Sequence, residues 1–169
     1  MSKISALLGD TYEQRRRDLL VRKFDLHGFE FRVRVPLSSE TDAIHARISS
    51  PPAEAVEAAF LKISEPLQKY RADADDSMTF TDDDIVLTST GEDGKRTVRS
   101  LRESARMQVM TSSRITEYIR LLVAADGSDA LAEITYDEIN AEWPLQVQLA
   151  LVDKIGEVIA PTYQEARGK

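Results

Sequence analysis

The acidic segment between residues 73 and 84 holds the residue types whose spacing comes nearest to a metal site. Carboxylates and hydroxyls at alternate positions of a twelve-residue loop are typical calcium ligands. Position 6 of such a loop is Met78 where the sharp turn needs glycine, and position 12 is aspartate where the motif has glutamate. The sequence therefore favours a solvated acidic loop, with a contact patch for a basic partner as the alternative. The residues near positions 1, 3, 5, 9 and 12 are Asp73, Asp75, Ser77, Thr81 and Asp84.

Three other chemical patterns match known motifs only in part. Gly91 and Gly94 enclose two residues where a phosphate-binding loop needs four, so we expect them in a hairpin turn. The two histidines, His27 and His45, lie in different contexts without metal-binding spacing. No serine has the G-x-S-x-G context of a hydrolase nucleophile. We therefore expect no catalytic residue, no metal and no cofactor, in a protein that is not an enzyme.

The composition narrows the possible partners. The chain has 169 residues, of which 42% are hydrophobic, which suffices for a core, and it contains no cysteine. Its formal net charge of −7 argues against nucleic-acid binding, which depends on neutralising phosphates. The one dense basic stretch, the arginines at 15–17 with Arg22 and Lys23, is expected to be a solvated helix face. Without a signal peptide or membrane span, the protein is expected in the cytoplasm with no membrane partner.

Hydrophobic periodicity predicts an α+β protein that is mainly α. Residues 1–22 are expected to form an N-terminal helix or mobile arm, and residues 23–169 a single, mainly helical domain. Alternation over 23–35 predicts a hairpin with the turn His27-Gly28 and with Phe24 opposite Phe31. A second hairpin is predicted near 85–99. We expect the two hairpins to supply one small antiparallel β-sheet beside a helical bundle.

Helix signals occupy most of the remaining chain. Helices are predicted from Ser38 and from Pro52, and over 101–125 with a break at 111–113 left open. Within the last of these, Met107 and Met110 are expected to fill the core, with an adaptable binding surface as the alternative. Near 135–138, a threonine followed three residues later by glutamate predicts a capping box for a short helix.

The last predicted helix, which begins near Pro144, carries more apolar surface than one core needs. At about 100° per residue its apolar side chains cover an arc of about 200°, about twice the width expected of a helix that faces one core. The surplus predicts burial between two layers of the same chain, or contact with a neighbouring copy or a partner helix. The candidate binding residues are Trp143, Leu145, Val147, Leu149, Leu151, Val152, Ile155, Val158 and Ile159.

Two segments, 102–123 and 141–169, resemble the tail assembly chaperones of long-tailed, lambda-like bacteriophages. The resemblance lies in an acidic residue, a Trp-Pro pair and an amphipathic helix that ends near a proline. Here these are Glu142, Trp143-Pro144, residues 145–159 and Pro161. The two segments cover 51 of the 169 residues, and no catalytic motif is included.

The resemblance implies a mostly helical protein that performs no chemistry. Such chaperones coat the long tape measure protein in many copies, keep it soluble in the host cytoplasm, and leave as tail tube subunits polymerise. The resemblance further implies self-association and a longer, frameshifted product whose extension recruits the tail tube protein. It does not include the hairpin at 23–35, whose role stays open.

Three other functions stay open on the sequence. Another phage interaction protein, such as a head-tail connector or tail completion factor, has the same acidic, helical composition. An enzyme site could be assembled from scattered carboxylates such as Asp73, Asp82 and Asp137, and divalent cations would then stabilise the fold. A regulator that used the basic stretch against nucleic acid would bind with a steep salt dependence.

Overall fold

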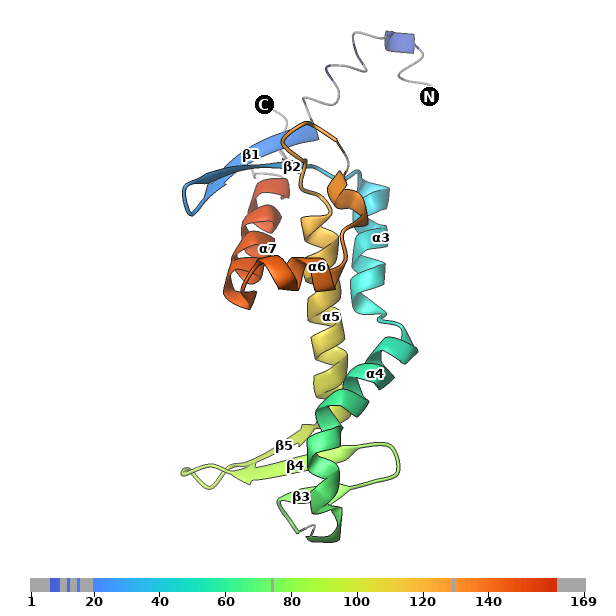
Figure 1. The fold of residues 1–169 in the computed structure, drawn as a ribbon, viewed down its shortest axis with the longest axis vertical. Helices are drawn as coiled ribbons and strands as arrows, with labels where there is room; N and C mark the ends of the chain where they lie inside the picture. The colour runs from blue at the N-terminus through green and yellow to red at the C-terminus, as the bar shows by residue number, and fades with distance from the viewer. Residues whose placement is uncertain are drawn as a thin grey trace. The chain divides into compact units, whose positions relative to one another are not determined.

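The structure is a computed structural model that describes residues 7–9, 12, 15, 20–73, 75–128 and 130–160. The fold is α+β and mainly helical, as predicted (Figure 1). The chain divides into two compact units. Unit 1 contains the described residues up to His45 and from Arg114 onwards, and unit 2 is the intervening chain from Ala46 to Ser113. Each unit has its own small antiparallel sheet.

Unit 1 begins with the predicted hairpin, strands β1 (Val21–Leu26) and β2 (Phe29–Arg34). Phe24 pairs with Phe31, and their stacked rings lie 5.4 Å apart. His27 and Gly28 both have positive φ, 54° and 82°, the combination that a two-residue turn between twisted strands requires. The predicted register and turn are therefore confirmed.

The hairpin is followed by helix α3 (Ser38–Ser49), which starts at the predicted serine and crosses the boundary between the units. Unit 1 then resumes at the end of α5 (Leu101–Ile119). A short 3₁₀ helix, η2 (Ala130–Glu133), and the helices α6 (Tyr136–Glu142) and α7 (Leu145–Ile159) complete it. The predicted capping box at Thr135 and Glu138 is present at the start of α6.

Helix α7 holds the hairpin and α5 together. It contacts both strands, and the Arg22 guanidinium donates to the Val158 carbonyl oxygen over 2.7 Å where the hairpin crosses the C-terminal end of α7 (Figure 1). A Cβ added at Gly156 would lie 3.6 Å from the Tyr118 ring, so the two helices approach closely there. The buried apolar residues of unit 1 are Phe24, Val33, Ile44, Ile115, Ile119, Leu121, Leu122, Ile139, Leu151, Val152 and Ile155.

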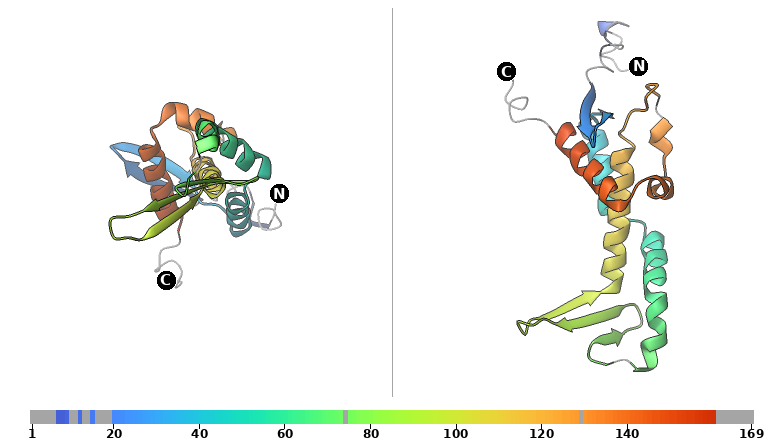
Figure 2. Two further views of the ribbon diagram at one scale, coloured as in Figure 1. Left: turned by 90° about the horizontal axis from the view of Figure 1, so that it is seen from below. Right: turned by 60° about the vertical axis from the view of Figure 1, so that its left-hand side comes forward.

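Unit 2 is a helix packed on a three-stranded sheet (Figure 2). Helix α4 (Ala53–Ser64) ends just before Glu65-Pro66, and the chain continues as a 3₁₀ helix, η1 (Glu65–Asp73). The strands β3 (Met78–Phe80), β4 (Ile85–Thr90) and β5 (Arg96–Ser100) lie in sequence order, which leaves β5 at an edge. The core is built from Phe60, Ile85, Leu101 and Ala105, with Ile63, Leu67, Met78, Phe80 and Leu87 packed against them.

Several sequence-based expectations differ from the structure. The two hairpins lie in separate sheets, of two and three strands, because each belongs to a different unit. The chain forms two compact units whose boundaries fall inside α3 and α5, where no linker composition marks them. One domain over residues 23–169 stays a prediction. No break interrupts α5 at 111–113, where the Thr111 and Ser112 hydroxyls donate to the carbonyl oxygens of Met107 and Val109. Most of the expected arm, and Pro161, lie outside the described residues.

Two leucines of α7 provide a matched test of this packing. Leu151 is fully buried and Leu149 is 41% exposed. Leu151→Ala is expected to lower the free energy of unfolding by about 2–5 kcal/mol, whereas Leu149→Ala is expected to cost less than about 1 kcal/mol. Urea denaturation followed by the fluorescence of Trp143, the single tryptophan, measures both values in unit 1. Equal losses would contradict the placement of the two side chains.

Candidate functional site

The corner between α6 and α7 is fixed by local hydrogen bonds. In the capping box the Glu138 amide donates to the Thr135 hydroxyl over 3.3 Å, and the Thr135 amide donates to the Glu138 carboxylate over 2.8 Å. Trp143 is extended and leads into Pro144, which precedes the first turn of α7. Gln148 is fully buried, and its side-chain amide donates to the Trp143 carbonyl oxygen over 2.7 Å. Gln148, a polar residue within the apolar arc of α7, therefore helps to fix where the helix begins.

The structure divides the nine candidate binding residues into three groups. Leu151, Val152 and Ile155 are at most 1% exposed and belong to the core of unit 1, so this part of the arc serves the protein's own fold. Leu145 and Leu149 are 47% and 41% exposed. The other four are half-buried, namely Trp143, Val147, Val158 and Ile159. A partner surface on α7 is thus limited to the rim of the arc.

We call Leu145, Leu149 and the residues exposed beside them the α7 rim. Leu145 and Leu149 lie one helical turn apart, and the same face continues through Gln146, Asp153 and Glu157. Asp153 lies 3.8 Å from Arg114, and Glu157 lies 2.9 Å from Lys154. From α6 to the end of α7 the chain carries five carboxylates and one lysine, so the rim lies in an acidic stretch.

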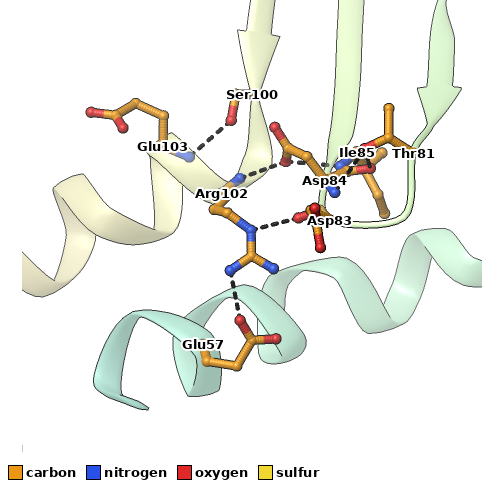
Figure 3. A network of polar contacts seen from close by, with 8 residues as sticks. All are labelled: Glu57, Thr81, Asp83, Asp84, Ile85, Ser100, Arg102 and Glu103. Atoms are coloured by element: carbon orange, nitrogen blue, oxygen red, sulfur yellow. Dashed lines mark hydrogen bonds and ion pairs between the residues drawn. The ribbon is translucent and has the colours of Figure 1, made fainter. Parts of the chain in front are cut away.

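The acidic segment that ends at Asp84 has a structural role in unit 2 (Figure 3). Arg102, at the start of α5, donates through Nε to the Asp83 carbonyl oxygen and through Nη1 to the Glu57 carboxylate, the latter over 2.6 Å. Its guanidinium carbon lies 4.3 Å from the centre of the Phe60 ring. One arginine therefore joins α4, α5 and the turn before β4.

Asp84 is held as a carboxylate in the same network (Figure 3). Its side chain accepts hydrogen bonds from the amides of Ile85 and Arg102, over 2.8 and 2.9 Å. Burial raises the pKa of Asp84, but hydrogen bonds from the Ser100 side chain and from these two amides outweigh it, so the pKa lies below its usual 3.8. These interactions explain why an aspartate stands here without any need for a ligand.

The structure does not bring the other residues considered for metal binding or catalysis together into one site. Among the described side chains, no group of three or more His, Asp and Glu residues is arranged to hold a metal ion. Asp82 belongs to unit 2 and Asp137 to unit 1, and the side chain of Asp73 lies outside the described part. His27 occupies the β1–β2 turn and His45 lies in α3. The glycines at 91 and 94 belong to the β4–β5 turn, as predicted.

The sequence analysis did not predict the exposure of two apolar side chains, Met107 and Phe29. Met107 is 53% exposed, so its expected core role is wrong, and its exposure depends on tertiary packing that periodicity does not report. Phe29, which alternation places on the apolar face of the hairpin, is 71% exposed. The available signal was its position beside the turn, where a covering element seldom reaches.

Comparison of the chain with protein family models, with curated proteins and with solved structures gives no match. Within the described ranges, no helix is both long enough and apolar enough to cross a membrane.

Arg102→Ala is expected to destabilise unit 2 by about 1–3 kcal/mol, because it removes the hydrogen bonds to Glu57 and Asp83 and the contact with Phe60. Arg102→Lys is not expected to restore the lost stability, because an ammonium group lacks the planar arrangement of N–H donors that a guanidinium has. Hydrogen exchange of the β4 amides measures the effect in this unit. Arg106→Ala, at an exposed position one turn along α5, is the control and is expected to be neutral. Similar exchange rates in Arg102→Ala and the control would refute the role of the network.

The lowered pKa of Asp84 predicts an acid-sensitive contribution to stability. Because the folded-state pKa lies below 3.8, the contribution is complete above pH 3.8 and is lost as the pH falls through the folded value. Asp84→Asn is therefore expected to make unit 2 less stable at neutral pH and less sensitive to pH below 3.8. Carboxyl NMR titration gives the pKa directly, and a midpoint for Asp84 at or above 3.8 would contradict the assignment.

Proposed function

We propose that this chain is a non-enzymatic tail assembly chaperone that binds the tape measure protein of a long-tailed bacteriophage and keeps it soluble in the host cytoplasm. The observation that carries the proposal is the α7 rim. Leu145 and Leu149 stay exposed, at 47% and 41%, on a helix whose inner face is fully buried. The rim lies in the segment that resembles the chaperone family.

The α7 rim suits a helical partner. Two leucines one turn apart give a short apolar stripe, which matches the way amphipathic helices pack on one another. The half-buried Trp143 lies just before this stripe, and tryptophan is frequent among the residues that dominate binding energy. A long, mostly helical protein such as a tape measure protein presents many such sites, so many copies of the chain would coat it.

The acidic stretch around the rim adds a preference for the partner's charge. Glu142, Asp153 and Glu157 are exposed near the two leucines. A partner helix that carries lysine or arginine beside its apolar stripe would associate faster and with better discrimination than an acidic one. A longer, frameshifted product that recruits the tail tube protein is part of the same proposal.

The test is to co-express the chain with the tape measure protein, whose long gene is expected directly downstream, and then to analyse the product by pull-down and light scattering. The wild-type chain is expected to give a soluble complex with several copies per long partner. Leu149→Glu, which places a charge in the rim at an exposed position, is expected to leave the long partner insoluble while the variant itself stays folded.

The matched control is Leu61→Glu, because Leu61 is 58% exposed on α4 in unit 2 and is expected to tolerate the same change without losing the partner. If the wild-type chain fails to solubilise the long protein, the chaperone proposal is wrong, and a head-tail connector or tail completion factor becomes the better candidate. If Leu149→Glu and Leu61→Glu behave alike, the rim is not the binding site.

A further inference from the structure

Strand β5 is an open edge of the sheet in unit 2 (Figure 2). Its neighbour in the sheet is β4 alone, and residues 96–99 are all exposed. The five residues of β5 pair with β4 in continuous register, without the bulge or proline that protects many edge strands. Val98, near the middle of the strand, is 61% exposed. The edge is therefore regular, accessible and partly apolar.

The hydrogen bonds of β4 show which backbone groups of β5 face the open side. The Thr88 amide donates to the Ser77 carbonyl oxygen over 2.8 Å, in the direction of β3. Backbone groups of successive residues in a strand point to opposite sides, so the two neighbours of Thr88 bond to β5. The register pairs those neighbours with residues 97 and 99. The amides and carbonyl oxygens of Arg96 and Val98 therefore point away from β4, toward the open side.

The side chains of this edge favour an acidic partner. Arg96 and Arg99 are exposed, and neither forms an ion pair with any carboxylate in the described part of the chain. Lys95, by contrast, pairs with Asp93 over 3.2 Å. The strand itself contains no aspartate or glutamate. Because opposite charges directly across two strands stabilise the pair, carboxylates on an added strand would be favoured here.

We propose that β5 binds an extended acidic segment of another protein, which joins the sheet as a fourth strand. An antiparallel strand is favoured, since antiparallel pairs are slightly more stable. Acidic residues of the partner then lie opposite Arg96 and Arg99, and an apolar residue covers Val98. Read along the partner, the pattern is acidic, apolar, any residue, acidic. Backbone hydrogen bonds supply the affinity, and the side-chain pairs supply the selectivity.

A nucleic acid fits this edge less well than a peptide does. The open side offers backbone donors and acceptors in strand geometry, which only another polypeptide strand pairs in full. The net charge of −7 also opposes the approach of a phosphate chain, whereas a short peptide segment carries only a few charges. The backbone groups and the charge therefore both favour the peptide.

The test measures binding of the full chain to a short peptide, blocked at both ends, with the central sequence glutamate-valine-threonine-glutamate. Fluorescence anisotropy of the labelled peptide gives the affinity, which is expected to fall as salt is added. One control peptide has lysine in place of both glutamates. A second has an N-methylated valine, which removes one backbone donor and keeps every charge. Each control is expected to bind about tenfold more weakly or worse.

Variants of the chain test the same contact from the other side. Val98→Pro removes an amide that points to the open side and takes no donor from the β4–β5 ladder. It is expected to weaken peptide binding about tenfold, while hydrogen exchange of the β4 amides stays as in the wild-type chain. If Val98→Pro unfolds unit 2, the N-methylated peptide makes the same comparison on the wild-type chain.

The charge is tested by Arg96→Gln and Arg99→Gln. Each is expected to weaken peptide binding about threefold, the effect of one exposed cross-strand pair. Lys62→Gln is the matched control, because it removes the same charge from an exposed position on α4 in the same unit. It is expected to bind the peptide as the wild-type chain does.

Four results would overturn the proposal. They are no binding of the acidic peptide, equal binding of the N-methylated peptide, equal binding of the lysine peptide, and tighter binding of single-stranded RNA than of the acidic peptide. The edge belongs to unit 2 and the α7 rim to unit 1, and the test contains no tape measure protein. Failure of this proposal therefore leaves the chaperone proposal standing, and the reverse also holds.

Discussion

The pairing of β2 with the chain that follows α5 is the interaction on which unit 1 depends. The Arg34 amide donates to the Leu121 carbonyl oxygen over 2.8 Å, and the Val123 amide donates to the Arg32 carbonyl oxygen over 2.9 Å. Between them Val33 bridges Leu122 and is fully buried. A two-stranded hairpin alone is marginal in water. With β1 on one edge and this segment on the other, β2 gains the support that lets α7 pack on the hairpin.

Features set by neighbouring residues could be predicted from the sequence. The His27-Gly28 turn fixes the first hairpin's register, and the Thr135 capping box fixes the start of α6. Features set by distant residues could not. The division into two units depends on which elements pack together, and nothing local marks it because its boundaries fall inside α3 and α5. Strand β3 has three residues, too few for a periodic signal.

The candidate site shows the same limit. Periodicity identified α7 as a helix with surplus apolar surface, but it could not separate residues that face the chain's own core from those on the rim. That separation depends on the hairpin and α5, which leave Leu151 buried and Leu149 exposed. Gln148 shows the same limit for a polar residue. The sequence places it within the apolar arc, but only the structure shows that its side-chain amide donates to the Trp143 carbonyl oxygen. Spacing predicts which residues share a face, and tertiary contacts decide what covers it.

The edge position of β5 has a consequence for the protein at high concentration. An open edge of a sheet invites the addition of a further strand and so promotes aggregation. Here the edge strand is short and exposes Arg96 and Arg99 on either side of Val98. A second copy that paired along this edge would bring like charges together and would desolvate them. The β5 edge therefore resists extension of this sheet into fibrils.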